Sequence, residues 1–153
     1  MNQPYSGAEA PRFARNDATA DAPTVAALRD EFGRWLRRNV GIDETRLCDV
    51  VLAVNEALAN VAEFAYLDRD EPGTVDLEAV VDPRRTVLTV TVGDQGHWRD
   101  TDPLRTARNR GRGIPLMRTL ADAVVIDTSA LGTSVCLRFD NVGASRPAGL
   151  LTR

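Results

Sequence analysis

Hydrophobic residues recur at helical spacing in two segments of the first half of the chain. Between Thr24 and Asn39 they occur every three or four positions and Gly41 follows, which predicts a helix over this range. A second helix is predicted from about Glu44 to Tyr66, preceded by Asp43, a residue type that caps helix N-termini. On a helical wheel, one side of this second helix is hydrophobic and forms the expected core face: Leu47, Val50, Val51, Val54, Leu58, Val61 and Ala65.

Most of the remaining chain alternates between hydrophobic and polar residues, as half-buried strands do. A short helix is predicted at 114–121. The segment 94–112 before it is predicted to be irregular. A turn is predicted at the sequence DPRR, because proline favours the second position of a turn. Strands are predicted at 11–18, 75–81, 87–92, 124–128 and 133–139.

Antiparallel strand pairs with helices grouped apart from them are typical of one architecture. The order of elements predicts an α/β (α+β) two-layer sandwich, in which helices pack on one face of a mixed, mainly antiparallel sheet. We expect a single domain over residues 12–140. Residues 1–11 and 141–153 contain several Gly, Ala, Ser and Pro residues and are expected to be flexible tails.

Composition excludes several kinds of active site. The 153 residues include 19 arginines but no lysine, and only one histidine. The chain therefore has no Walker A lysine, no strand lysine of the protein-kinase fold and no Schiff-base lysine. His97, Cys48 and Cys136 lie too far apart in sequence for a zinc motif. Because both cysteines have apolar neighbours, we expect them to be buried free thiols.

Charge and hydropathy indicate where the protein acts. The net charge of −3 produces no general attraction for nucleic acid. The first residues lack the apolar segment of a secretory signal, and no run of apolar residues is long enough to span a bilayer. We therefore expect a cytoplasmic protein that binds neither nucleic acid directly nor a membrane.

The polar side of the second helix carries the first candidate chemistry. Asp49, Glu56, Asn60 and Glu63 lie opposite the hydrophobic face, and Glu56 and Asn60 are one helical turn apart. Such a row is often just the solvated side of an amphipathic helix. A carboxylate beside an amide oxygen also suits Mg²⁺-nucleotide chemistry. The helix alone leaves both interpretations open.

Three glycine-containing segments favour the nucleotide interpretation. Gly93-Asp94-Gln95-Gly96 follows a predicted strand, and its carboxylate could accept a hydrogen bond from an exocyclic amine. Asn109-Arg110-Gly111-Arg112-Gly113-Ile114 opens the short helix, where backbone N–H groups and the helix dipole favour a phosphate. Gly132-Thr133 begins the last strand. Each segment alone would be a common turn or linker.

In this order, the motifs resemble the Bergerat (GHKL) ATP-binding fold of gyrase, Hsp90, histidine kinases and MutL. Four segments are more specifically similar to the anti-sigma factor serine/threonine kinases of the RsbW and SpoIIAB type. They are VVLAVNEALANVAEFAY (50–66), TVTVGDQGHWRD (89–100), GRGIPLMRTLADAVVI (111–126) and GTSVCLRF (132–139). The similarity covers roughly residues 12–140.

The resemblance implies a role for each motif. Glu56 would be the general base, and Asn60 would ligate Mg²⁺ bridging the ATP phosphates. Asp94 would bind the adenine amino group, Gly96 would leave room for the base, and Thr133 would support it. Gly111, Arg112, Gly113 and Ile114 would surround the phosphates, with residues 98–110 as a lid.

Two residues depart from the family pattern. Phe64 stands where the family often has histidine, and Trp98 stands where the second glycine of the D-x-G-x-G motif is expected. Both leave the strength of nucleotide binding and of kinase activity open.

The resemblance also implies partners. The protein would sequester an alternative RNA polymerase sigma factor and phosphorylate an anti-anti-sigma (STAS-domain) protein, and a homodimer is compatible with it. The alternative is a catalytically weak or inactive, nucleotide-gated binding module for the same partners, which could belong to a multidomain phosphatase–kinase regulator. The catalytic part of a histidine kinase is disfavoured, because the single histidine lies in the expected lid region.

Overall fold

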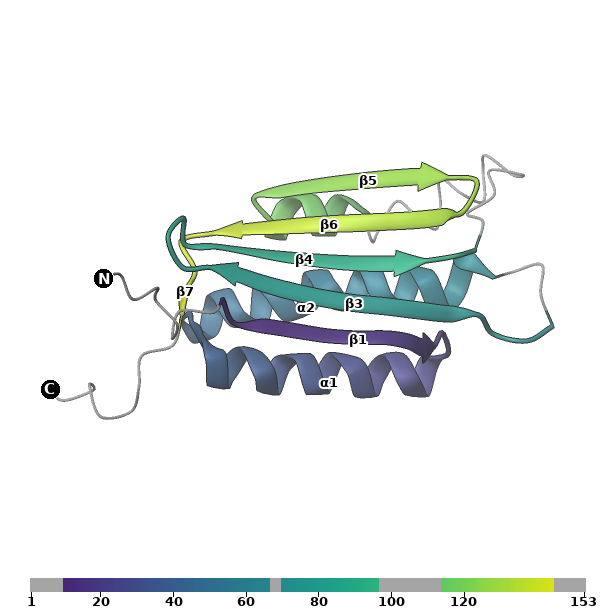
Figure 1. Cartoon of the computed structure of the whole chain (residues 1–153), viewed down its shortest axis with the longest axis horizontal. Coiled ribbons are helices and arrows are strands. Elements are labelled where there is room, and N and C mark those ends of the chain that lie inside the picture. Colours follow the sequence, from purple (N-terminus) through teal and green to yellow (C-terminus); the bar gives the residue numbers. More distant parts are fainter. Residues whose placement is uncertain (1–9, 67–69, 97–113, 145–153) are drawn as a thin grey trace, which may run out of the picture.

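Helices cover one face of a five-stranded sheet (Figure 1). The computed structural model describes residues 10–66, 70–96 and 114–144. A short helix without a label in Figure 1 spans residues 114–120. The labelled elements, in chain order, are β1 (Arg12–Thr19), α1 (Ala22–Asn39), β2 (Val40–Gly41), α2 (Glu44–Asn60), η1 (Val61–Ala65), β3 (Thr74–Asp82), β4 (Val87–Asp94), β5 (Ala123–Ser129), β6 (Gly132–Asp140) and β7 (Gly143–Ala144). Because the helices form one layer and the sheet the other, the predicted two-layer sandwich is confirmed.

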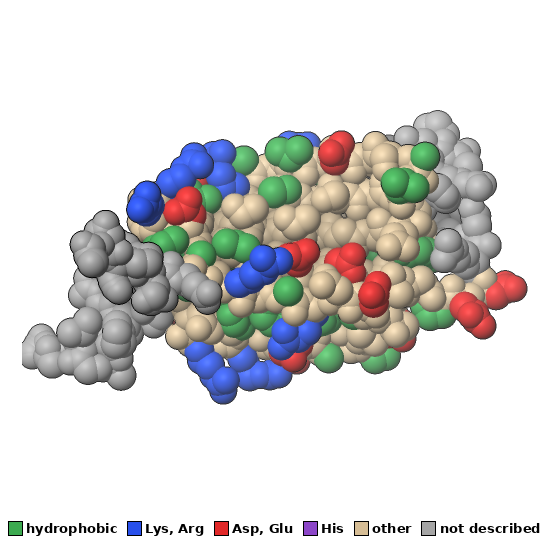
Figure 2. All heavy atoms as spheres, viewed as in Figure 1, with side chains coloured by type: hydrophobic (Ala, Val, Ile, Leu, Met, Phe, Trp, Pro, Cys, Tyr) green, Lys and Arg blue, Asp and Glu red, His purple; other side chains and the backbone are tan. Residues whose placement is uncertain are grey.

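The main sheet has the strand order β1-β3-β4-β6-β5, and each of these described pairings is antiparallel. Every second residue of β3 and β4 is buried, as expected for strands with one face on a core. No helix of the described residues lies on the opposite face of the sheet. Figure 2, seen from the same side as Figure 1, shows hydrophobic side chains scattered there among basic and acidic ones.

Both long helices begin at a capping aspartate. The Asp21 carboxylate accepts a hydrogen bond from the Thr24 amide at 2.9 Å, and the Asp43 carboxylate accepts one from the Arg46 amide at 2.7 Å. The hydrogen bond from Thr24 also lowers the pKa of Asp21 below its ordinary value. These caps satisfy amides that the first turn of a helix leaves unpaired. The starts of α1 and α2 thus follow from sequence-local chemistry.

The predicted second helix contains a change of geometry. Its α-helical part ends at Asn60, and the next five residues form the π-helix η1. A π-helix is wider than an α-helix, and short π segments are often found at functional sites. Nothing in the hydrophobic spacing distinguished this segment from the α-helix before it.

The folded part of the chain extends beyond the boundary predicted at residue 140. Strand β7 pairs with β2, which follows α1. Val142, which lies between β6 and β7, is fully buried, and its amide donates a hydrogen bond to the Thr86 carbonyl at 2.9 Å. Residues 141–144 are therefore part of the domain and not of a flexible tail; a two-residue strand is too short to show alternation.

The expectation of two buried cysteines was wrong. Cys48 is exposed on α2, and Cys136 is partly buried. Cys136 lies in β6 between the core-facing positions Val135 and Leu137, so its own side chain belongs to the opposite face of the sheet. Apolar neighbours in sequence do not decide which face of a helix or strand a residue occupies.

Candidate functional site

Three buried polar side chains identify the candidate site. Among the described residues, the buried polar or charged positions are Asn60 (6% exposed), Asp94 (8%) and Thr133 (4%). They come from the end of α2, the end of β4 and the start of β6. Burying a polar group is unfavourable unless a partner compensates it. All three are residues to which the sequence analysis assigned a ligand-binding role.

Two of the three lie side by side in the sheet. Asp94 and Thr133 are paired residues of β4 and β6, and paired residues of antiparallel strands point to the same face. Each ends a row of buried core residues, which in β4 is Leu88, Val90 and Val92. Their side chains therefore lie on the helix-covered face, at the edge of the hydrophobic core.

Gly132 brings the strand containing Thr133 close to Asp94. Its φ of +148° lies in a region that favours glycine, and an added Cβ would stand 1.9 Å from the Asp94 carbonyl oxygen. No other residue type fits there without moving the backbone. The Gly-Thr pair at the start of the last strand is thus more than an ordinary hairpin turn.

The loop after β4 is held in place by a hydrogen bond within the loop and by its close contact with η1. The Gly96 amide donates a hydrogen bond to Asp94 Oδ1 at 3.0 Å. A Cβ on Gly96 would stand 2.0 Å from the Ala65 carbonyl oxygen. The space left by the missing side chain is thus occupied by η1, whereas the sequence analysis assigned it to a nucleotide base. Gly96 is required for the close approach of η1 to this loop.

Tyr66, which the sequence analysis did not single out, connects three segments beside Asp94. Its hydroxyl donates to the Thr74 carbonyl at 2.6 Å and accepts from the Gln95 amide at 3.0 Å. Its ring lies against two glycines, because a Cβ on Gly73 or Gly96 would stand 2.2 or 2.9 Å from Tyr66 Cε1. A tyrosine directly after a helical segment gives no sequence signal for such a role.

The structure corrects the expected position of Asn60. The helical wheel placed it opposite the core face, yet its side chain is buried. A wheel gives only an angle, and it cannot show that η1, which continues α2, packs against the loop after β4. Glu56, one turn earlier, is only partly buried, as expected for a residue on the polar side.

The amide of Asn60 has unused hydrogen-bonding capacity. Within the described part of the chain, its Nδ2 atom is the one buried side-chain nitrogen or oxygen that lacks a hydrogen-bond partner. Such an atom destabilises a folded protein. A buried, incompletely bonded amide is consistent with a group that completes its interactions by binding a ligand.

These residues fit the Mg²⁺ that the Bergerat resemblance implies. An amide oxygen is a suitable ligand for a hard cation. The described residues contain no group of three or more His, Cys, Asp or Glu side chains that could hold a metal. Mg²⁺ is commonly bound by one or two protein groups together with substrate phosphates. Asn60 is therefore suited to a metal that arrives with a nucleotide.

The remaining predicted site residues are only partly described. Gly111, Arg112, Gly113 and the whole of the expected lid, including Trp98, lie outside the described residues. Ile114 is partly buried at the start of the described helical segment 114–120, and Phe64 is partly buried in η1.

The far end of segment 114–120 is bound to α2. Arg46 Nη1 donates to the Leu120 carbonyl at 3.0 Å, and the same guanidinium forms an ion pair with Asp122. The Asp140 amide donates to Asp122 at 2.8 Å and, together with Arg46, keeps the pKa of Asp122 below its ordinary value. The helix that follows the predicted phosphate loop is thereby fixed to α2, the helix that carries Asn60.

A family model for the histidine kinase-like ATPase domain matches residues 18–139. The chain belongs to this family. The matched range includes the three buried polar residues and the glycine segments. The Bergerat fold predicted from the four motifs is thus confirmed.

Solved structures agree with this assignment. The RsbU and RsbW domains of Rv1364c from Mycobacterium tuberculosis match with a TM-score of 0.66 and 22% identity, over 93% of this chain and 35% of that one. The histidine kinase domain of a blue-light-activated kinase from Erythrobacter litoralis EL346 matches with a TM-score of 0.50 and 26% identity, over 62% of this chain and 44% of that one. This chain thus spans about a third of the first of these chains. The likeness to the structure that contains the RsbW domain is one of fold.

No described helix is long and apolar enough to cross a membrane.

Proposed function

We propose that this protein is an ATP-dependent serine/threonine kinase and anti-sigma factor of the RsbW type, acting in the cytoplasm. It would sequester an alternative sigma factor and phosphorylate a STAS-domain antagonist, as in the control of a stress response. The observation that supports the proposal most strongly is the burial of three polar side chains, Asn60, Asp94 and Thr133, in a domain of the histidine kinase-like ATPase family.

In this proposal, Asp94 accepts a hydrogen bond from the adenine amino group, and Thr133 supports the base from the adjacent strand. Tyr66 and Gly96 keep the Asp94 loop against η1. Asn60 would hold Mg²⁺ through its amide oxygen, and the metal would neutralise charge on the phosphates. Gly111, Arg112 and Gly113 would bind the phosphates, using backbone amides and arginine in a chain without lysine.

Glu56 is proposed as the general base. It lies one helical turn before Asn60 and is partly exposed, so an acceptor hydroxyl from a partner protein can reach it. The carboxylate would take the proton of the serine or threonine hydroxyl while the hydroxyl oxygen bonds to the γ-phosphorus and the bond to ADP breaks. Phosphoryl transfer depends mainly on such positioning and on charge stabilisation.

The test compares Glu56→Gln with the wild type, using partners first identified by affinity capture from the native cells. Transfer of label from γ-labelled ATP to the STAS protein should fall by about 10²–10⁴ in rate, whereas nucleotide and sigma-factor binding should persist. Glu63→Gln is the matched control, because Glu63 is an exposed carboxylate in the adjoining η1 segment. Glu63→Gln should transfer label to the STAS protein at the wild-type rate.

Three outcomes would change the proposal. Equal labelling by the wild type and Glu56→Gln would remove Glu56 as the base. Nucleotide binding without labelling by the wild type would favour the alternative, a nucleotide-gated binding module, which the Phe64 and Trp98 departures allow. Failure to retain any sigma factor with ADP or ATP present would remove the anti-sigma role.

A further inference from the structure

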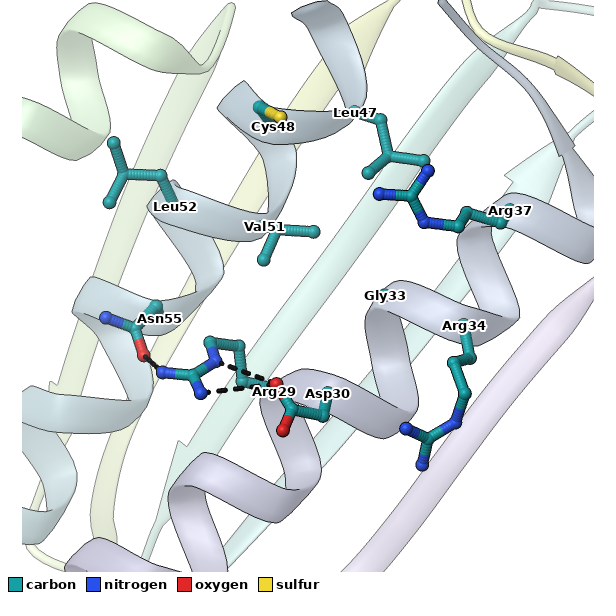
Figure 3. A pocket seen from close by; sticks show the side chains of 10 residues that line it. All are labelled: Arg29, Asp30, Gly33, Arg34, Arg37, Leu47, Cys48, Val51, Leu52 and Asn55. Carbon is teal, nitrogen blue, oxygen red and sulfur yellow. Dashed lines mark hydrogen bonds and ion pairs between the residues drawn. The ribbon is translucent and has the colours of Figure 1, made fainter. Parts of the chain in front are cut away.

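A groove runs between α1 and α2, and none of the residues of the candidate nucleotide site lines it (Figure 3). It has a volume of about 490 Å³. The wall from α2 is largely apolar and includes Val51, the exposed Leu52 and Cys48. The wall from α1 carries Arg29, Gly33 and Arg37 at intervals of four residues, together with Asp30 and Arg34.

An arginine crosses from α1 toward α2 at each end of the groove. Arg29 Nη1 donates to Asn55 Oδ1 at 3.4 Å at one end. Arg37 Nη1 donates to Glu44 Oε2 at 2.8 Å at the other. Arg29 also forms an ion pair with its neighbour Asp30 at 3.2 Å (Figure 3). The Arg37–Glu44 side chains are 54% and 66% exposed and the Arg29–Asp30 side chains 37% and 60%, and ion pairs this exposed contribute little to stability. Carboxylates from another molecule could therefore take over either arginine at little cost.

Gly33 lies midway between the two arginines in sequence and opposite Val51. Glycine in the interior of a helix is destabilising relative to alanine. Packing against α2 does not require it, because an added Cβ would meet only Val51 Cγ2, at an ordinary 3.8 Å. The effect of this glycine is to leave the middle of the groove open.

We propose that this groove docks an acidic amphipathic helix of a partner protein. A large apolar side chain of that helix would lie over Gly33 and Val51. Carboxylates four residues before and after it would pair with Arg29 and Arg37, because eight residues of any α-helix span about 12 Å, the same rise that separates the two arginines. The proposal does not depend on nucleotide binding, so it can fail or hold independently of the proposed function.

The probe is a fluorescein-labelled, alanine-based helical peptide with a central leucine stripe and a glutamate four residues to either side. Its twin carries lysine at the two glutamate positions. Binding to the full-length protein is measured by fluorescence anisotropy without nucleotide. The glutamate peptide should bind about tenfold more tightly than the lysine twin, the effect expected of two exposed ion pairs. Absence of binding by the glutamate peptide, or equal binding by both, overturns the proposal.

Variants locate the binding site. Gly33→Leu should fill the groove and weaken the glutamate peptide about tenfold, the effect of losing one buried apolar side chain. Gly33→Ala should raise the melting temperature and still weaken the peptide, so lost binding cannot be attributed to lost folding. Arg37→Glu should abolish the preference for the glutamate peptide, because one of its two ion pairs becomes repulsive. Arg85→Glu, at the exposed β3–β4 turn, should leave the affinity of both peptides unchanged. If Gly33→Leu bound the glutamate peptide as tightly as the wild type, the peptide would not be binding in this groove.

Cys48 reports on what covers the groove. Its exposed thiol should react freely with a maleimide in the protein alone and be protected by the glutamate peptide. Protection in the free protein at low concentration would mean that the chain covers its own groove. Protection that appears only at high protein concentration would indicate that a second copy of this protein covers the groove. Either result overturns the proposal of a partner helix.

Discussion

Replacing Asn60 by leucine should stabilise the protein while removing its response to nucleotide. Leucine is apolar and similar in size, so the substitution removes a buried amide whose Nδ2 atom lacks a partner. An unsatisfied buried polar group costs about 1–3 kcal/mol, so removing it should gain about 2 kcal/mol. Misfit of a new side chain of similar size would offset up to about 1 kcal/mol of this gain. The free energy of unfolding should therefore rise by about 1–2 kcal/mol.

The corresponding rise in melting temperature is about 2–8 °C for a chain of this size. Saturating Mg-ATP should stabilise the wild type further, by about 2.7 kcal/mol at a hundred times its dissociation constant. Asn60→Leu should lose this increment because the amide ligand is gone. Thermal unfolding of both proteins, with and without Mg-ATP, measures the two effects together.

Asn55→Leu is the matched control. Asn55 lies on the same helix, but its Oδ1 accepts a hydrogen bond from Arg29, so this substitution should not stabilise the fold and should leave the Mg-ATP increment intact. The reasoning would be refuted if Asn60→Leu melted below the wild type, or if it kept the full increment. A wild type that does not respond to Mg-ATP would refute the nucleotide site itself.

Two further substitutions test the surroundings of the site. Tyr66→Phe removes two hydrogen bonds and should lower the free energy of unfolding by about 1–3 kcal/mol; calorimetry should also show weaker ADP binding, and unchanged affinity would contradict a positioning role for Tyr66. Asp122 has a pKa below its ordinary value of 3.8, so its carboxylate stabilises the fold at neutral pH and this contribution is lost as the pH falls through the lowered pKa. Asp122→Asn should thus have a lower urea midpoint at neutral pH and lose less stability on acidification, and a parallel loss in both proteins would contradict this account.

The sequence was most informative where one physical pattern dominates. Helical periodicity placed α1 and α2, with Asp43 marking the start of α2, and strict alternation placed β3 and β4. The residues of the candidate site could be named from sequence, because Asp94 follows a predicted strand, Thr133 follows a glycine, and the motifs together resemble a known family; their ligand-binding roles stay predictions. The burial of Asn60, Asp94 and Thr133 adds an energetic reason to connect these motifs.

The features that sequence analysis missed depend on contacts between distant residues. The role of Tyr66 requires Gly73 and Gly96 to approach it from two other segments. The β2–β7 pairing is too short to produce a periodic pattern, and the geometry of η1 is not encoded in hydrophobic spacing. For Cys48, the apolar residues around it in sequence face the core while the thiol itself faces outward.

The pairing of β2 with β7 also affects how this domain could be joined to others. By register, Arg12 pairs with Val80, near the end of β3 that lies farthest from Asp94. Ala144 pairs with Val40, directly after α1, and Figure 1 shows β7 at the end of the sheet opposite the tip of β4. A polypeptide continuing in either direction leaves from this end. Neighbouring domains, affinity tags or fluorescent proteins can therefore be attached at both ends without standing over the Asp94–Thr133 corner.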